Sequence, residues 1–263
     1  MNPRAQRAWL LGGGAWLPGA ALPVTDRAVR YGMSVFETIG VRDGQPLLAS
    51  EHLALLGESA AALLGIPAQG IPGTLPVLDP RDTGVLRLYV TAGDGSAHDA
   101  ADAPRVFALF ESLPDGTLPA EQSARLHPEA AAPFARGRKT ANYWLQCEAQ
   151  RAARAAGFDH ALLADHRGNL LSAAFGNVFF VSGGELCTPA LSLAVRPGVI
   201  RAWVMRRHPV REVEFSAAQL DGISELFVTN SRLGVMPLRC GAAAPGPVGC
   251  GLRDDCLRRK ITP

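Results

Sequence analysis

The order of strand-like and helical segments is the feature that most constrains how this 263-residue chain can fold. Apolar runs typical of strands occur at 85–91 and 106–110, and glycine-containing turns divide 161–171 and 177–187 into two hairpin-like units. Hairpins mixed with helices fit antiparallel or mixed sheets, whereas a doubly wound parallel sheet places a helix between successive strands. The sequence therefore predicts an α+β fold.

Three helices are expected among these strands. The first covers 51–64, because Ser50 is a good N-cap, Gly65 is a good residue to end a helix, and the apolar residues between them form one stripe. A second helix is expected over 141–156. A third is expected over 197–207, because a Pro-Gly pair opens it.

A stretch rich in proline and glycine at 113–119 is the best linker candidate. It divides the chain into an N-terminal lobe, 1–114, and a C-terminal lobe, 115–263. The chain is long enough for one large domain or two modest ones, each with its own core.

Composition excludes several classes of partner. Hydrophobic residues make up 48% of the chain and charged residues 19%, which describes a globular protein. The net charge of +2 gives no electrostatic case for nucleic acid or an anionic membrane, and no apolar run approaches the roughly 18 residues of a membrane helix. Five cysteines without a C-x-x-C pair argue against a disulfide framework or a metal site. We therefore expect a cytoplasmic protein that binds no nucleic acid, membrane or metal.

Only two lysines occur, Lys139 and Lys260, and the other 24 of the 26 basic residues are arginine. Lys260 lies in a terminal Arg-Arg-Lys run, where a surface cation is the simplest interpretation. Lys139 lies in the middle of the chain. A lysine can lose its proton near neutral pH and attack a carbonyl as a free amine, which arginine cannot do. On this observation alone, a nucleophilic Lys139 and a chance surface lysine remain equally acceptable.

Several segments resemble motifs of the class IV pyridoxal-phosphate-dependent aminotransferases and lyases. Residues 26–38, DRAVRYGMSVFET, are similar to the family signature DR-x-x-x-YGDG-x-FET. The other matches follow in the family's order. They are Glu51-His52-Leu53, Lys139 to Tyr143, Asp159 to Leu163, Asn177-Val178-Phe179, Pro197 to Arg201 and Thr229 to Pro237.

The resemblance covers about residues 10–240 and implies a fold, a cofactor and a reaction. The implied fold has a smaller N-terminal α/β lobe and a larger C-terminal lobe with a barrel-like sheet. Pyridoxal 5′-phosphate would lie in the cleft between them, in a homodimer. The short chain and the ending TNSRLGVMP are most similar to the aminodeoxychorismate lyases, which convert 4-amino-4-deoxychorismate to pyruvate and 4-aminobenzoate. A class IV aminotransferase of small or branched-chain amino acids, and a degenerate homologue acting as a binding protein, remain alternatives.

The same resemblance implies roles for individual residues. Lys139 matches the lysine that holds the cofactor as a Schiff base and then moves the proton. Thr38 matches a threonine near the substrate, where it would help the leaving group depart. The backbone N–H groups of Val199 and Ile200 match the turn that faces the cofactor phosphate. Ser231 matches a hydroxyl at the same phosphate, and Asn230 is its neighbour in that motif.

Four further residues match or suggest positions in the substrate pocket. Tyr31 and Tyr143 match pocket-lining positions, and Arg30 and Arg87 are better interpreted as pocket or surface cations than as catalysts. Asp26 and Arg27 begin the first motif, and one interpretation of this pair is a structural salt bridge.

Two positions depart from the family pattern at cofactor contacts. Leu55 stands where the helix motif H-L-x-R-L has an arginine that clamps the phosphate, and such a contact is worth roughly 1.5–3 kcal/mol. Ser172 stands where a glutamate keeps the pyridine nitrogen protonated. A serine can hydrogen-bond this nitrogen but supplies no negative charge. Because elimination needs less carbanion delocalisation than transamination, Ser172 favours the lyase over the aminotransferase and leaves the degenerate homologue open.

Overall fold

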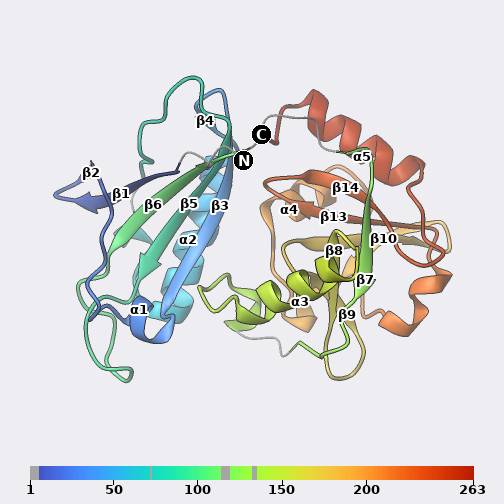
Figure 1. Ribbon diagram of the computed structural model, residues 1–263, viewed down its shortest axis with the longest axis horizontal. Coiled ribbons are helices and arrows are strands. Elements are labelled where there is room, and N and C mark those ends of the chain that lie inside the picture. The colour runs from blue at the N-terminus through green and yellow to red at the C-terminus, as the bar shows by residue number, and fades with distance from the viewer. Residues whose placement is uncertain (1–5, 72, 114–118, 132–134) are drawn as a thin grey trace. The chain divides into compact units, whose positions relative to one another are not determined.

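The computed structural model describes residues 6–71, 73–113, 119–131 and 135–263. Within these ranges the chain forms two compact units (Figure 1). Unit 1 comprises Met1–Gly116, Arg138–Asn142 and Ile261–Pro263, and unit 2 comprises Thr117–Gly137 and Tyr143–Lys260. Residues 114–118 of the expected linker lie outside the described residues.

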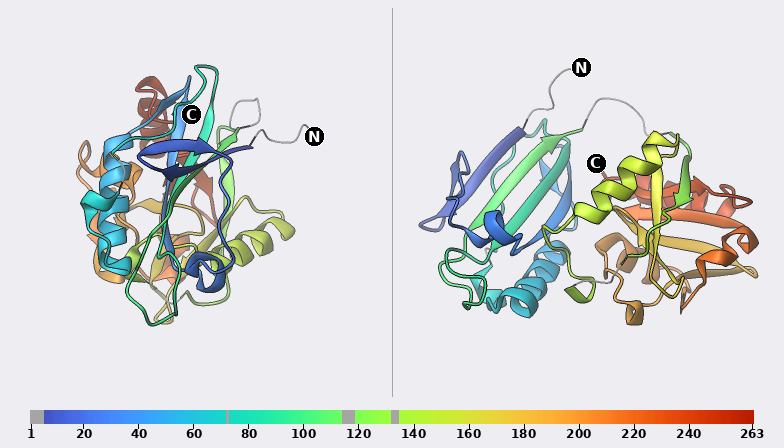
Figure 2. Two further views of the ribbon diagram at one scale, coloured as in Figure 1. Left: turned by 90° about the vertical axis from the view of Figure 1, so that its left-hand side faces the viewer. Right: turned by 60° about the horizontal axis from the view of Figure 1, so that its bottom comes forward.

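Unit 1 is built around a six-stranded antiparallel sheet of strand order β2-β1-β6-β5-β3-β4. Helix α2 runs along one face of this sheet (Figures 1 and 2). The elements are β1 (Gln6–Gly12), β2 (Ala15–Pro18), α1 (Arg27–Tyr31), β3 (Ser34–Arg42), β4 (Gln45–Pro46), α2 (Ala49–Leu64), β5 (Gly84–Thr91) and β6 (Val106–Ser112).

The core of unit 1 lies between α2 and the sheet. Alternate residues of β3, namely Val35, Ile39 and Val41, are fully buried there together with Leu56 of α2. Side chains of a strand alternate between its faces, so Phe36 and Thr38 project from the opposite face of the sheet. The sequence of β3 thus fixes which of its residues can reach a ligand and which belong to the core.

Helix α2 confirms the expected helix at its C-terminal end and corrects its start. Gly65 ends it in the left-handed conformation, with φ 67°. The expected N-cap, Ser50, is wrong: the helix begins at Ala49 after Leu48, which has φ 51° and makes no side-chain cap. Ser50 instead donates its hydroxyl hydrogen to Glu51, at 2.9 Å.

Unit 2 contains an eight-stranded mixed sheet of order β12-β11-β10-β13-β14-β7-β8-β9. The pairs β11/β12, β14/β7 and β7/β8 are parallel. The elements are β7 (Gln122–Leu126), α3 (Trp144–Ala155), β8 (His160–Ala164), β9 (Leu170–Ala173), β10 (Asn177–Ser182), β11 (Glu185–Pro189), α4 (Val199–Met205), β12 (Arg211–Val213), β13 (Glu225–Asn230), β14 (Gly234–Arg239) and α5 (Pro247–Arg258).

Both expected hairpins are present in unit 2, as β8/β9 and β10/β11. Their turns contain glycines with positive φ, Gly168 at 81° and Gly184 at 82°. The sheet of each unit is curled, most plainly in unit 2 (Figure 2). The α+β fold expected from the sequence is confirmed.

Two helices of the second half are shorter than the sequence indicates. Helix α3 begins at Trp144 instead of residue 141, because Thr140 forms a bridge with Val35 and the Ala141 N–H donates to the Ser34 carbonyl, at 3.1 Å. Helix α4 ends at Met205. None of the helices within the described ranges is both long and apolar enough to cross a membrane.

Candidate active site

Lys139 lies on a short segment, 138–142, that pairs with the edge of β3. The Phe36 N–H donates to the Lys139 carbonyl, at 3.0 Å. This pairing joins the lysine to unit 1, whereas the boundaries expected from the sequence grouped it with the second half. The Lys139 ammonium lies 4.4 Å from the ring centroid of Phe36, and its Nζ donates a 2.9 Å hydrogen bond to Thr38 Oγ1. The structure therefore brings the two expected catalytic residues together.

Gly32 holds the far end of the same segment. Asn142 donates its side-chain N–H to the Gly32 carbonyl, at 3.1 Å. Gly32 has φ 68°, and a Cβ there would lie 2.6 Å from Asn142 Oδ1. Only glycine meets both demands, the left-handed backbone and the close approach of the amide. The glycine of the first motif thus helps to position the lysine segment.

Arg87 occupies the same face of the sheet as Thr38, since the two residues are paired across β3 and β5. Its guanidinium contacts Glu111 Oε2, at 2.8 Å. Tyr89 lies next along this face and stacks on Phe36, with centroids 4.9 Å apart. Burial raises the pKa of Tyr89, and the Arg87 charge opposes this shift. This face therefore combines an amine, a hydroxyl, a cation and aromatic rings.

Behind Thr38, on the core face of β3, lies a buried pair that sequence reasoning missed. Glu37 Oε2 and His52 Nδ1 are 2.8 Å apart, and their side chains are 1% and 3% exposed. The pair connects α2 to the strand that carries Thr38. A signal was present in the alternation of β3, because Glu37 must face the core when Phe36 and Thr38 face away, and a buried carboxylate needs a partner.

Arg30 and Tyr31, the two pocket candidates on α1, are exposed. The Arg30 guanidinium lies 4.8 Å from the Tyr31 ring centroid and donates to the Gly95 carbonyl, at 3.3 Å. Their described contacts are thus with each other and with the loop after β5.

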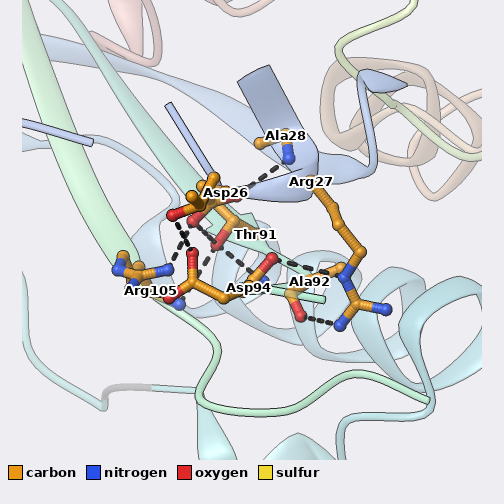
Figure 3. Close-up of polar contacts among 9 residues, drawn as sticks. Asp26, Arg27, Ala28, Thr91, Ala92, Asp94 and Arg105 are labelled. Carbon is orange, nitrogen blue, oxygen red and sulfur yellow. Dashed lines mark hydrogen bonds and ion pairs between the residues drawn. The ribbon is translucent and has the colours of Figure 1, made fainter. Parts of the chain in front are cut away.

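Asp26 and Arg27 do not form the salt bridge considered as one interpretation of the sequence (Figure 3). Asp26 is fully buried and pairs with Arg105, at 2.9 Å, while it accepts the Thr91 hydroxyl hydrogen, also at 2.9 Å. Its other oxygen caps α1 by accepting the N–H of Ala28. The carboxylate therefore joins α1 to the ends of β5 and β6.

Arg27 is also fully buried, and backbone carbonyls satisfy its guanidinium. Figure 3 shows it reaching toward the chain that follows β5. A guanidinium offers five N–H donors, and five carbonyls accept here. They belong to Ala92, Gly93, Ser96, Asp99 and Ala100. Arg27 thereby fixes the conformation of the loop that touches Arg30.

In unit 2, the start of α4 offers amide groups to an anion. The first-turn N–H groups of a helix, here those of Val199 and Ile200, have no acceptor inside the helix, and the helix dipole favours negative charge there. The preceding Gly198 has no side chain to cap them, and a Cβ on it would lie 2.2 Å from Asn177 Oδ1. Asn177 also donates to the Arg196 carbonyl, at 2.7 Å, which holds the turn before α4.

Asn230 organises the turn that carries Ser231. Its Oδ1 accepts the N–H groups of Arg232 and Leu233, at 3.0 and 2.8 Å, and its Nδ2 donates to the Phe175 carbonyl, at 2.9 Å. The Asn230 amide is therefore engaged in joining two turns, and the half-buried Ser231 is the hydroxyl that this turn presents.

Thr229 is a further candidate donor that sequence reasoning missed. It is 2% exposed, and its Oγ1 has no hydrogen-bond partner among the described residues. Its cross-strand partner is Asn177, which contacts Gly198, so Thr229 belongs to the face of the sheet that meets the start of α4. Thr229 is identified as a candidate only by the pairing of β13 with β10, which joins residues far apart in sequence.

Ser172 and Tyr143 complete the candidates of unit 2. Ser172 is half-buried on β9, paired with Leu163, and can offer a hydroxyl but no charge to a ring nitrogen. Tyr143 precedes α3, and its ring centroid lies 5.8 Å from that of Phe175. Over the described part of the chain, no group of three or more His, Cys, Asp or Glu side chains is placed to hold a metal.

The amino-transferase class IV family profile matches residues 34–239, and the chain belongs to this family. Class IV aminotransferases use pyridoxal 5′-phosphate, and branched-chain amino acid aminotransferases of this fold have been solved with N-(5′-phosphopyridoxyl)-L-glutamate and with pyridoxamine 5′-phosphate. Within unit 2 the amide and hydroxyl donors fit a phosphate, and within unit 1 the amine of Lys139 fits an aldehyde; each is taken by itself.

Relatives within the family include both lyases and aminotransferases. A Methanocaldococcus jannaschii protein assigned as a branched-chain-amino-acid aminotransferase is 28% identical over 83% of this chain and 82% of its own. An aminodeoxychorismate lyase from Vibrio harveyi is 25% identical over 87% of this chain and 90% of its own. The crystal structure of 4-amino-4-deoxychorismate lyase from Pseudomonas aeruginosa matches with a TM-score of 0.78 and 27% identity, over 95% of this chain and 98% of that one.

Proposed function

We propose that this protein is a pyridoxal-phosphate-dependent lyase that acts on 4-amino-4-deoxychorismate and releases pyruvate and 4-aminobenzoate. The observation that carries the proposal is the 2.9 Å contact between Lys139 Nζ and Thr38 Oγ1. It places a hydroxyl, which can donate or accept a proton, beside the one lysine that lies away from the ends of the sequence. The lyases from Vibrio harveyi and Pseudomonas aeruginosa support the choice of reaction.

Each residue has a defined task in this proposal. When bound, pyridoxal phosphate supplies an electron sink for the bond changes at the substrate carbon. Lys139 forms the covalent link to the cofactor and afterwards moves a proton with Nζ. Thr38 exchanges a proton through Oγ1 with the departing group. The N–H groups of Val199 and Ile200, with the Ser231 hydroxyl, bind the phosphate.

The absence of a carboxylate at Ser172 supports elimination over transamination. A neutral hydroxyl does not stabilise a protonated ring nitrogen as a carboxylate does, so the ring withdraws electrons less strongly. Elimination with a good leaving group would need negative charge at the substrate carbon to be stabilised only briefly, whereas transamination would need it to be stabilised for longer. Arg196 and Arg232, in the two turns that present the phosphate donors, are candidates for the positive charge that Leu55 does not supply.

A class IV aminotransferase is the second candidate. It is supported by the Methanocaldococcus jannaschii relative, which has the highest of the identities given above. The two functions differ in product. The lyase yields pyruvate and 4-aminobenzoate in equal amounts, whereas an aminotransferase moves the amino group of a small or branched-chain amino acid to a 2-oxo acid. Incubating the loaded protein with each substrate and quantifying both products decides between them.

The visible absorption spectrum of the loaded protein tests whether the chain is an enzyme of this class at all. We expect a cofactor band that borohydride abolishes, that Lys139→Ala lacks and that Lys260→Ala retains. A wild-type protein that stays colourless in excess cofactor would contradict both catalytic functions and leave a degenerate binding protein.

We also propose that the protein is a cytoplasmic homodimer. Valines on and before α1, Val24 and Val29, are 78% and 54% exposed, and burial against a second copy would remove this apolar surface from water. Five unpaired cysteines suit a reducing compartment. Light scattering after gel filtration should give a mass near twice the 27.8 kDa of the chain.

A further inference from the structure

Phe175 is an aromatic side chain that the fold leaves outside its cores. It lies in the tight turn between β9 and β10, where the N–H of Ala173 donates to the Gly176 carbonyl at 2.9 Å. The phenylalanines that follow on β10, Phe179 and Phe180, are fully buried, whereas Phe175 is 42% exposed. Leaving a large apolar ring in water forgoes the stabilisation that burial gives, so its retention in a turn calls for an explanation.

The turn that carries Phe175 is held rigidly against β13. A Cβ on Gly176 would lie 2.5 Å from Val228 Cγ2 and 2.7 Å from the Thr229 carbonyl oxygen, so the turn backbone is in direct contact with the strand. The Phe175 carbonyl accepts the Asn230 Nδ2 hydrogen, at 2.9 Å. The ring therefore projects from a fixed position beside the turn that presents Ser231.

A second ring stands next to it. Tyr143 contacts Phe175 with centroids 5.8 Å apart and planes inclined by 37°. Tilted pairs of this kind offer ring faces and edges to a third ring, because offset-stacked and edge-to-face arrangements are favourable at 4.5–7 Å between centroids.

We propose that Phe175, supported by Tyr143, is a specificity-determining residue that selects ligands whose six-membered ring is unsaturated and near-planar, as in a cyclohexadiene acid or a benzoate, over saturated rings. The proposal rests on the proposed function, in which Tyr143 matches a position that lines the substrate pocket. A planar ring acid can stack on these side chains, whereas a saturated ring of the same size presents axial hydrogens and an aliphatic chain presents little area. Phe175 thus discriminates between substrates of equal charge by their flatness.

The test is the binding of two carboxylates of similar size by the cofactor-loaded protein, measured by calorimetry. Benzoate is flat and cyclohexanecarboxylate is not. We expect wild type to prefer benzoate, and Phe175→Ala to bind benzoate roughly 3- to 10-fold more weakly while its affinity for cyclohexanecarboxylate changes less. Phe175→Leu keeps an apolar side chain in the turn and should also lose the preference. Leu191→Ala, which alters an equally exposed side chain (43%) of unit 2, is the matched control and should behave as wild type.

Three results would overturn the proposal: no measurable binding of benzoate by wild type, equal affinity of wild type for the two acids, or an unchanged preference in both Phe175 variants. The proposed function can fail independently of this inference. If the protein takes up no cofactor, the same titrations are made on the protein as purified, because both rings belong to the chain. If Phe175 governs benzoate binding but no 4-aminobenzoate is produced, the lyase assignment fails and this inference stands.

Discussion

Among single residues, Thr38 and Lys139 carry the chemistry that we propose for this chain. They are 101 positions apart in sequence, yet the pairing of 138–142 with β3 places Nζ and Oγ1 within hydrogen-bond distance. In the proposed lyase reaction, this hydroxyl would relay a proton between the lysine and the departing group. The sequence indicated both residues, the lysine by its rarity and the threonine by resemblance, but it contained no measure of their separation.

Thr38→Val tests this contact, since valine keeps the shape of the side chain and removes the hydroxyl. We expect kcat for pyruvate release to fall by roughly two orders of magnitude, the lower end of what a positioned proton donor contributes, while the cofactor band persists. Thr38→Ser should stay within about tenfold of wild type, because it restores the hydroxyl. A Thr38→Val enzyme with the wild-type kcat would remove Thr38 from the catalytic steps.

His160 makes stability depend on pH. It is 8% exposed, its Nε2 lies 2.8 Å from Gln122 Oε1, and burial lowers its pKa to about 4, although the neighbouring Asp159 opposes the shift. The unfolded chain, with an ordinary value near 6.5, therefore binds the proton more tightly than the folded one. The stability that the neutral His160 contributes is fully present above about pH 6.5 and is lost as the pH is lowered toward 4.

The expected loss is about 2 kcal/mol between pH 7 and pH 5, from the difference between the two pKa values. Urea unfolding at the two pH values measures it. In His160→Gln, which does not titrate, the loss should shrink by a similar amount. An equal loss in this variant would assign the acid sensitivity to other groups.

Among the elements, α5 shows how a distant side chain can fix the start of a helix. Glu225 of β13 is buried, and its carboxylate accepts the N–H groups of Val248 and Gly249, at 3.2 and 2.8 Å. The N-cap, Gly246, makes room for this carboxylate, because a Cβ there would lie 2.4 Å from it. Gly251, in the interior of the same helix, has no atom within 4 Å of a Cβ.

These two glycines should respond in opposite directions to the same change. Gly246→Ala should destabilise the protein by about 1–3 kcal/mol, since it displaces a buried carboxylate from its donors. Gly251→Ala should stabilise it by up to about 1 kcal/mol, because alanine favours the helix and nothing obstructs it. Thermal unfolding of both variants measures the difference, and destabilisation of equal size in both would contradict the role given to Glu225.

Local pattern predicted some elements of the fold but not α5, and long-range pairing accounts for other differences. Both hairpins and the end of α2 at Gly65 follow from turn glycines and helix-ending signals. The late start of α3 does not, because Thr140 and Ala141 are withdrawn from the helix by hydrogen bonds to β3. Likewise, the Thr229 hydroxyl, which has no hydrogen-bond partner within the described part of the chain, is recognised only when β13 is aligned with β10.

For the whole molecule, the residues assigned to the cofactor are divided between the two units. Lys139 belongs to unit 1, and Val199, Ile200 and Ser231 belong to unit 2. Residues so far apart in sequence become one set of candidates only through the family motifs that they match. The family profile over residues 34–239 confirms the resemblance, whereas the roles of the individual residues remain predictions.

The attachment point of the cofactor can be mapped chemically, and it decides whether Lys139 is the residue that binds pyridoxal phosphate. The loaded protein is reduced with borohydride and digested, and its peptides are examined by mass spectrometry for a phosphopyridoxyl group. With only two lysines in the chain, the outcome is simple to interpret. We expect the peptide containing Lys139 to carry the group and the peptide containing Lys260 to lack it. A group found on Lys260, or an unlabelled Lys139 in protein that binds the cofactor, would contradict this expectation.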